Sequence, residues 1–170
     1  MPVDVNKLCH ELYNSEKNIK GIIKKDIVPV IGCTGAGKST LINFLQGRDL
    51  TKKKKGAKVS VFAPDAPGYP SIGESALASE TAYPGGYEVK DKDYLLCDTA
   101  GYLDTHSAEK SLSIPYANFL ATQYADTVKG VIILINFPSL FYNRADNFKK
   151  LSEIINTTFK NGAKDKVFSD

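Results

Sequence analysis

The segment Gly32–Ser39 constrains the fold of this chain more than any other. It reads Gly-Cys-Thr-Gly-Ala-Gly-Lys-Ser and matches the pattern G-x-x-x-x-G-K-[ST], which is typical of a phosphate-binding loop. Such a loop needs a buried strand before it and a helix after it. The apolar run Ile27–Ile31 and a helix expected over Ser39–Gln46 supply both, although Pro29 is unusual within a buried strand. The sequence therefore predicts an α/β fold with an anion site at the end of its first strand.

The residues of this loop have distinct predicted roles. Glycines let backbone N–H groups converge on an anion, and the following helix directs its positive end to the same place. Lys38 is expected to contact the β- and γ-phosphates, and the Ser39 hydroxyl to ligate Mg²⁺. The converging N–H groups are also expected to lower the pKa of the Cys33 thiol. The predicted nucleotide-binding set is Gly32, Cys33, Thr34, Gly35, Ala36, Gly37, Lys38, Ser39 and Thr40.

A second motif, Asp98-Thr99-Ala100-Gly101, follows the apolar run Leu95–Cys97. In a parallel sheet the carboxyl end of that strand lies beside the phosphate loop. Asp98 is therefore expected to hold Mg²⁺, directly or through a water molecule. Gly101 is expected to bring its N–H close to the γ-phosphate, where a side chain would obstruct the approach. The alternative for this motif alone is an ordinary turn at the end of a strand.

Apolar runs alternate with helical patterns along the rest of the chain, which favours a mostly parallel sheet with helices on both faces. Pro115 must begin or bend the helix that contains it. Residues 48–80 are expected to be irregular, with one strand at Lys58–Phe62. The chain divides into an N-terminal helix, residues 1–25, and one domain, residues 26–170. The other predicted elements are an amphipathic helix within residues 5–25, a hairpin of Tyr87–Lys90 and Tyr94–Cys97, a helix over Ala108–Tyr124, a strand at Val131–Ile135 and a helix over Asn143–Phe159.

Composition and charge limit the classes of partner. Apolar residues make up 42% of the chain and charged residues 24%, which excludes a disordered protein. The net charge of +3 is concentrated in residues 48–58, so a general nucleic-acid surface is not expected. The lysine run Lys52–Lys55 is interpreted as a solvated loop or, alternatively, as a contact for anionic lipid or RNA, although no aromatic residue interleaves it.

The compartment is predicted from three features of the sequence. No apolar run approaches the roughly 20 residues of a membrane helix. The start of the chain does not resemble a signal peptide. Three cysteines, an odd number without metal-site spacing, favour a reduced compartment. A cytoplasmic protein is therefore expected.

The segments IGCTGAGKSTLINFLQG and DTAGYLDT together resemble the translation-factor-related class of GTPases. The septin-like branch, which includes the immunity-associated GTPases, is the most similar. The resemblance implies a P-loop NTPase fold in three layers and a Mg²⁺-dependent conformational switch that hydrolyses GTP to GDP and phosphate. It also implies a homodimer or heterodimer across the nucleotide face as a partner arrangement.

The resemblance further implies roles for individual residues. In this branch a Ser-x-Thr segment supplies a threonine to Mg²⁺ and the γ-phosphate, and Ser79-Glu80-Thr81 stands at the corresponding place. Thr81 is the expected residue, with Ser71, Ser75 and Ser79 as alternatives. The candidate catalytic residues are then Lys38, Thr81 and Gly101, and the candidate metal ligands are Ser39, Thr81 and Asp98.

The chain departs from the family pattern in three places. Ala100 stands where this branch usually has proline, which is a minor change. Tyr102 stands where Ras-like relatives have a glutamine that orients water, so hydrolysis is expected to be slow or to need a partner's group. His106 is an alternative to that glutamine. The guanine-reading motif N/T-K-x-D is missing from its expected place, and Asn143–Asp146, which imitates it, is expected at a helix start.

These departures leave two other functions open. The missing guanine motif is expected if the chain is the N-terminal portion of a longer GTPase, truncated before the guanine-specificity strand. A nucleotide-stabilised interaction module that scarcely hydrolyses is the first alternative, and Tyr102 favours it. An ATPase or a kinase that uses the same loop is the second.

Overall fold

The structure is a computed structural model, and it describes residues 3–55, 58–72, 81, 83–101, 107–135, 149, 151–153 and 155–156. The helices are α1 (Val5–Asn18), the short 3₁₀ helix η1 (Ile19–Gly21), α2 (Lys38–Leu45) and α3 (Ala108–Tyr124). The strands are β1 (Ile27–Gly32), β2 (Thr51–Lys55), β3 (Lys58–Phe62), β4 (Gly85–Glu88), β5 (Leu95–Asp98) and β6 (Ile132–Leu134).

The main sheet has the order β4-β5-β1-β6 in the described part of the chain. β1 pairs in parallel with β5 on one side and with β6 on the other, with Val30 opposite both Asp98 and Ile132. β4 and β5 form an antiparallel hairpin, which confirms the predicted one with a shift of one or two residues. The parallel pairs on either side of β1 confirm a mostly parallel sheet.

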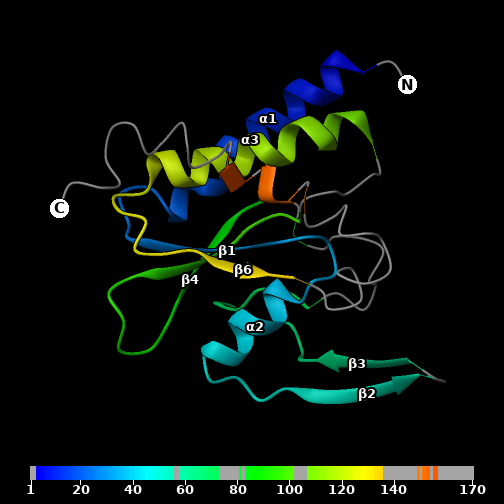
Figure 1. The fold of residues 1–170 in the computed structure, drawn as a ribbon, viewed down its shortest axis with the longest axis vertical. Helices are drawn as coiled ribbons and strands as arrows, with labels where there is room; N and C mark the ends of the chain where they lie inside the picture. The colour runs from blue at the N-terminus through cyan, green and yellow to red at the C-terminus, as the bar shows by residue number, and fades with distance from the viewer. Residues whose placement is uncertain are drawn as a thin grey trace.

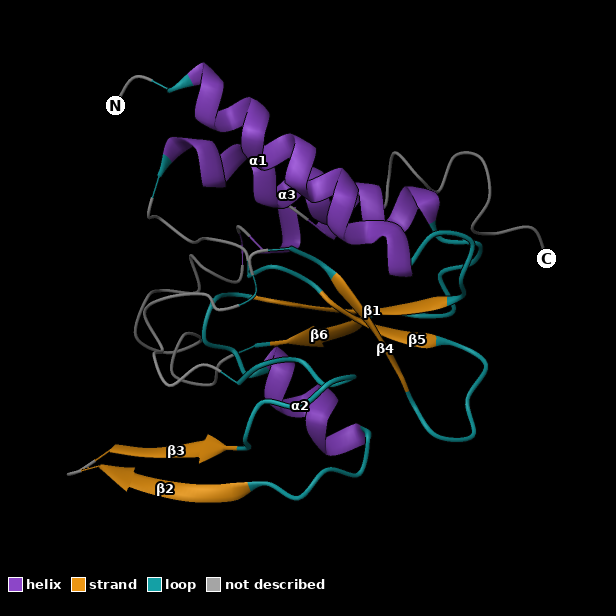
Figure 2. Cartoon of the chain, turned by 180° about the vertical axis from the view of Figure 1, so that it is seen from behind, coloured by secondary structure: helices purple, strands orange, loops and turns teal. Residues whose placement is uncertain are grey.

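Helices cover both faces of this sheet, as the α/β pattern predicted. α1 and α3 lie side by side over one face, and α2 lies over the other (Figures 1 and 2). The alternating side chains of the strands supply a core to each face. The core toward α1 and α3 contains Ile19, Ile22, Ile27, Cys97, Leu120 and Ala121, and the core toward α2 contains Val30, Ile42 and Leu96.

Pro29 lies inside β1, and the sheet accommodates it by a break in the pairing. Ile27 bridges to Val128, whereas Val30 pairs with Ile132, so the partner segment has one more residue between these two contacts. Proline has no N–H to donate to a ladder, and bulges are among the few places in a sheet where it is tolerated. The predicted strand is therefore correct, and the irregular residue lies where the pairing is interrupted.

Local capping explains where the helices begin and end. Asp4 caps α1 by accepting a hydrogen bond from the backbone N–H of Lys7, and Ser107 caps α3 by accepting one from Lys110. Gly47 adopts a φ of +77° directly after α2, which confirms its predicted role at the end of that helix. Pro115 lies in the interior of α3, so it does not begin that helix.

The largest correction concerns residues 48–80, which were expected to be irregular apart from one strand. The lysine run forms a strand of its own, β2, and pairs antiparallel with β3 along its whole length. This two-stranded ribbon is separate from the main sheet and lies beyond α2 (Figure 1). We call β2 and β3 together the lysine ribbon.

Several predictions fall outside the described residues. They concern Tyr102, His106, Ser75, Ser79, the segment 143–146 and the residues from 157 onward. Of the helix expected over Asn143–Phe159, the described positions are helical and Leu151 is buried. Within the part of the chain that the structure describes, no helix is both long and apolar enough to cross a bilayer.

Candidate phosphate and magnesium site

The Gly32–Ser39 loop connects the end of β1 to the start of α2, and three of its glycines are required by its shape. Gly35 and Gly37 have φ values of +76° and +90°, which side chains disfavour. A Cβ on Gly32 would lie 2.7 Å from the carbonyl oxygen of Leu134 in β6. The glycine spacing of the motif therefore follows from the backbone, independently of any ligand.

Lys38 lies within this loop and contacts its carbonyl groups. The side chain is buried at 6% exposure, and its Nζ donates to the carbonyl oxygens of Gly32 at 3.2 Å and Cys33 at 3.3 Å. Burial lowers the pKa of Lys38, and the nearby carboxylate of Asp98 opposes that shift. The loop therefore has an ammonium group at its centre.

Ser39, Thr81 and Asp98 come from three separate segments and meet at one point. The Ser39 hydroxyl donates to Oδ2 of Asp98 at 2.7 Å, and the Thr81 hydroxyl donates to the same oxygen at 3.2 Å. The two hydroxyl oxygens are 3.4 Å apart. The alternative Ser71 is exposed. The structure thus brings together all three residues that the sequence named as metal ligands.

The carboxylate of Asp98 is buried at the carboxyl end of β5. Its Oδ1 is buried and accepts no hydrogen bond from the described residues. Burial raises the pKa of Asp98, while hydrogen bonds from Ser39 and Thr81 and the charge of Lys38 oppose the increase. A carboxylate oxygen that is desolvated without a partner is a group that a cation would stabilise.

The donor set at this point fits magnesium better than a transition metal. Among the described residues, no group of three or more His, Cys, Asp and Glu side chains is arranged so that it could hold a metal ion. One carboxylate and two hydroxyl groups are oxygen ligands, and Mg²⁺ is typically bound by one or two carboxylates together with phosphates and water. Ser39, Thr81 and Asp98 could therefore hold Mg²⁺ beside a bound phosphate chain.

Gly101 lies against the Gly32–Ser39 loop, and this contact explains why it is glycine. A Cβ at this position would lie 2.6 Å from Oγ1 of Thr34 and 3.0 Å from the backbone nitrogen of Thr34. The sequence argument gave a different reason, an approach to the γ-phosphate. The structure shows a backbone-to-loop contact that no side chain could enter.

Sequence reasoning missed the residues that hold these segments in place. Thr99 donates to the carbonyl oxygen of Val30 at 2.7 Å, and Asn118 of α3 donates to that of Ala100 at 3.1 Å. Thr99 belongs to the Asp98–Gly101 motif, but no role was predicted for it, and nothing in the local sequence marks Asn118, because the partners of both residues are distant in the chain.

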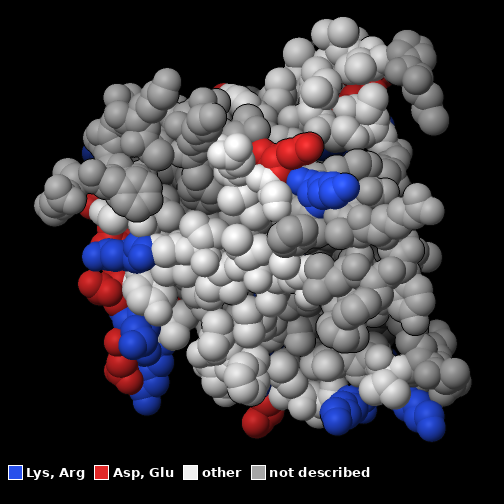
Figure 3. All heavy atoms as spheres, in the orientation of Figure 1, with Lys and Arg blue, Asp and Glu red and all other residues white. Residues whose placement is uncertain are grey.

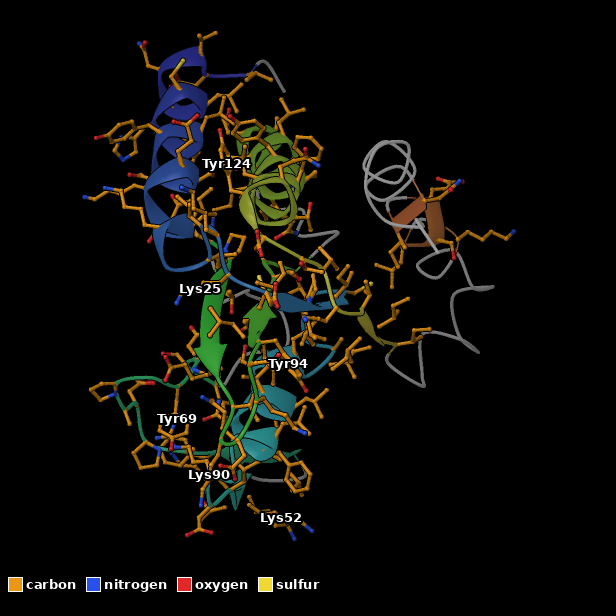
Figure 4. The ribbon with its side chains drawn as sticks, turned by 90° about the vertical axis from the view of Figure 1, so that its left-hand side faces the viewer. Lys25, Lys52, Tyr69, Lys90, Tyr94 and Tyr124 are labelled. Carbon is orange, nitrogen blue, oxygen red and sulfur yellow. The ribbon has the colours of Figure 1, made fainter. Side chains whose placement is uncertain are left out.

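Asn43 was also missed, and it connects α2 to the segment before Thr81. Its amide donates to the carbonyl oxygens of Ser39 and Pro70, both at 2.8 Å, and its Oδ1 accepts from Arg48 at 2.8 Å. Arg48 in turn lies 4.5 Å from the centre of the Tyr69 ring, which is labelled in Figure 4. The available signal in the sequence was a single asparagine within the apolar stretch Leu41–Leu45.

The expectation for Cys33 was wrong in direction. Burial raises the pKa of the Cys33 thiol above its usual value, and the charge of Lys38 only partly opposes this. The half-buried thiol is therefore less reactive than the loop motif suggested.

No family model, no curated protein and no solved structure matches the chain.

Proposed function

We propose that the chain is a GTP-binding protein with a P-loop NTPase fold, which hydrolyses GTP to GDP and phosphate as a Mg²⁺-dependent switch. The observation that carries the proposal is the meeting of Ser39, Thr81 and Asp98 beside a glycine loop that contains the Lys38 ammonium group. Guanine as the base rests on the resemblance of the Gly32–Ser39 and Asp98–Gly101 segments to the septin-like GTPases.

Phosphate binding would use groups that already converge on the loop. The loop leads into the N-terminus of α2, and the backbone N–H groups that have no partner within the first turn of a helix stabilise an anion. The Lys38 ammonium would exchange its two carbonyl acceptors for β- and γ-phosphate oxygens. Ser39, Thr81 and Asp98 would hold Mg²⁺, which neutralises charge on the phosphates when it is bound.

The reaction needs positioning rather than a covalent intermediate. The oxygen of a water molecule attacks the γ-phosphorus, and the bond from that phosphorus to the β–γ bridging oxygen breaks. GDP leaves with that oxygen, and the protons of the water remain with phosphate and solvent. Lys38 balances the charge on the phosphoryl oxygens throughout this step.

The same contacts support a switch. Thr81 is joined to the loop through Ser39 and Asp98, and Gly101 lies against Thr34. A ligand shifts a conformational equilibrium only if it interacts differently with the two states. The γ-phosphate provides this difference, because it would contact the segments of both Thr81 and Gly101 and be lost on hydrolysis.

The test is a competition titration of a fluorescent GTP analogue against GTP, GDP and ATP, with Mg²⁺ and with EDTA, followed by phosphate release over several turnovers. We expect GTP to compete better than ATP. Lys38→Ala should weaken binding about 100-fold, because it removes charge-assisted hydrogen bonds to two phosphates. Ser39→Ala should weaken binding only when Mg²⁺ is present.

Lys90→Ala is the matched control, since Lys90 is an exposed lysine in the loop between β4 and β5. An unchanged affinity in Lys38→Ala, with an unchanged circular dichroism spectrum, would contradict the site. Preference for ATP would replace the GTPase with an ATPase or kinase. Tight GTP binding without turnover would favour a nucleotide-stabilised interaction module.

A further inference from the structure

The lysine ribbon has two chemically different faces. Residues directly opposite each other in an antiparallel pair share a face. The pairs Lys52 with Val61 and Lys54 with Val59 therefore lie on one face of the ribbon. We call these four residues the lysine–valine face. The pairs Lys53 with Ser60 and Thr51 with Phe62 lie on the other face. There the Lys53 ammonium is 4.9 Å from the centre of the Phe62 ring.

The lysine–valine face is open to solvent. Val59 and Val61 are 59% and 38% exposed, and Lys52 and Lys54 are exposed as well. Residues 51–62 contain five lysines and no acidic residue. A strand pair that exposes two β-branched apolar side chains beside two exposed lysines has no evident role in stabilising the fold. Its charge selects an anionic partner.

The ribbon is placed where a large surface could reach it. It lies beyond α2, on the side of the molecule opposite α1 and α3 (Figure 1), and basic side chains are visible along the edge where β2 lies (Figure 3). Lys52 is at the extreme of the molecule in the side view (Figure 4). The base of the ribbon is anchored, because Arg48 bonds to Asn43 and to the carbonyl oxygen of Pro64.

We propose that the lysine–valine face binds the surface of an anionic lipid bilayer. Lys52 and Lys54 would pair with the headgroups of acidic lipids, and Val59 and Val61 would enter the interfacial region between them. The long lysine side chains suit this arrangement, since they carry charge at the tip of an apolar stem. This inference is independent of nucleotide binding.

Nucleic acid is the competing anion, and the ribbon fits it less well. A two-stranded ribbon has the width to enter the major groove of DNA. However, residues 51–62 include no Arg, Asn or Gln to read base edges. The one aromatic ring, that of Phe62, lies on the other face of the ribbon beneath the Lys53 ammonium, so the lysine–valine face itself has no ring for base stacking. Exposed valines gain nothing from a phosphate backbone, whereas they gain from a membrane interface.

The test is co-sedimentation of the whole chain with vesicles of phosphatidylcholine alone and of phosphatidylcholine with phosphatidylserine in equal parts. We expect binding to the acidic vesicles only. The variant Lys52→Gln with Lys54→Gln should bind them about 25-fold more weakly, because each lysine near an anionic bilayer strengthens binding about fivefold. Val59→Thr with Val61→Thr keeps β-branched strand residues and should weaken binding severalfold.

The matched control is Lys17→Gln with Lys20→Gln, which removes the same charge from exposed lysines in α1 and η1 on the opposite side of the molecule. It should bind like the unaltered chain. Equal loss in this control, or no loss in the ribbon variant, would overturn the proposal. So would equal binding to neutral vesicles, or binding to duplex or single-stranded RNA without binding to vesicles. Thermal unfolding of each variant shows that the fold is retained.

Discussion

Asp98 is a buried carboxylate whose ionisation opposes folding. Burial raises its pKa, so the folded protein binds this proton more tightly than the unfolded chain does. At a pH above the unfolded pKa of aspartate, ionisation of this side chain therefore destabilises the fold, and the effect grows until the pH passes the raised pKa. A buried carboxylate that reduces stability at neutral pH is better explained by a ligand than by structure.

Asp98→Asn should accordingly raise the unfolding free energy of the ligand-free protein at neutral pH, by about 1 kcal/mol. The same change should abolish the Mg²⁺ dependence of GTP affinity, because the amide is a poor ligand in place of the carboxylate. Urea denaturation and nucleotide titration with and without Mg²⁺ measure the two effects. A less stable protein with an unchanged Mg²⁺ response would show that Asp98 is structural.

Gly101 offers a test of its contact with Thr34 in the Gly32–Ser39 loop. Gly101→Ala places a methyl group within 3.0 Å of the Thr34 backbone, so we expect the unfolding free energy to fall by about 1–3 kcal/mol. Gly130→Ala is the control, because a Cβ there meets nothing within 4 Å. Equal urea midpoints for the two variants would mean that the Gly101 segment can move away from Thr34 without a loss of unfolding free energy.

Pro115 lowers the stability of α3. This residue is exposed and lies in the helix interior, where proline removes one backbone hydrogen bond and crowds the preceding turn. Pro115→Ala should raise the unfolding free energy by about 1–3 kcal/mol. Calorimetry measures the change, with Ala117→Gly as the opposite control. A loss of stability in Pro115→Ala would show that the packing of α3 on α1 depends on the proline.

Elements with a strong local signal were predicted and the others were not. β1 and α2 follow from an apolar run and the loop motif, and the β4–β5 hairpin from its flanking residues. β2 was missed because four consecutive lysines show no alternation of apolar and polar residues, and only the pairing with β3 makes this segment a strand. Pairing with the next strand along the chain overrode the preference of the lysine run itself here.

The part of the candidate site that lies at the ends of parallel strands could be predicted from the sequence. The rule that parallel strands end at one edge of a sheet predicted that Asp98 would lie near Ser39, and it does. Thr81 came only from the family resemblance. Asn43, Thr99 and Asn118 act through backbone carbonyls of distant segments, which no spacing in the sequence reveals.

The packing of α1 on α3 makes the stability of the whole protein sensitive to acid. Glu109, in the first turn of α3, accepts a hydrogen bond from the backbone N–H of Asp4 at 2.9 Å. That bond, with further hydrogen bonds from its own backbone and from Ser107, lowers the pKa of Glu109 to about 2. Because the folded pKa is below the unfolded one, this carboxylate stabilises the fold fully above about pH 4.5.

That contribution should be lost as the pH falls from about 4.5 to about 2, and not on the alkaline side. Glu109→Gln should lower the unfolding free energy at pH 7, because the carboxylate is removed. The variant should then lose less unfolding free energy than the unaltered chain as the pH falls through this range. Urea midpoints across this range measure it, and Asp65→Asn, which alters an exposed carboxylate, is the control. A pH profile in Glu109→Gln identical to that of the unaltered chain would contradict the assignment.

The order of the strands in space has a consequence for how the protein is synthesised. β1 leaves the ribosome well before its two neighbours in the sheet, β5 and β6. The lysine ribbon and α2 can form from local segments in the meantime, whereas pairing between distant segments is slow. β1 therefore has no strand partner until Leu95–Asp98 has left the exit tunnel, and its second edge stays unpaired until Ile132–Leu134 has followed. Throughout that interval the nascent chain is most exposed to aggregation and depends most on chaperones.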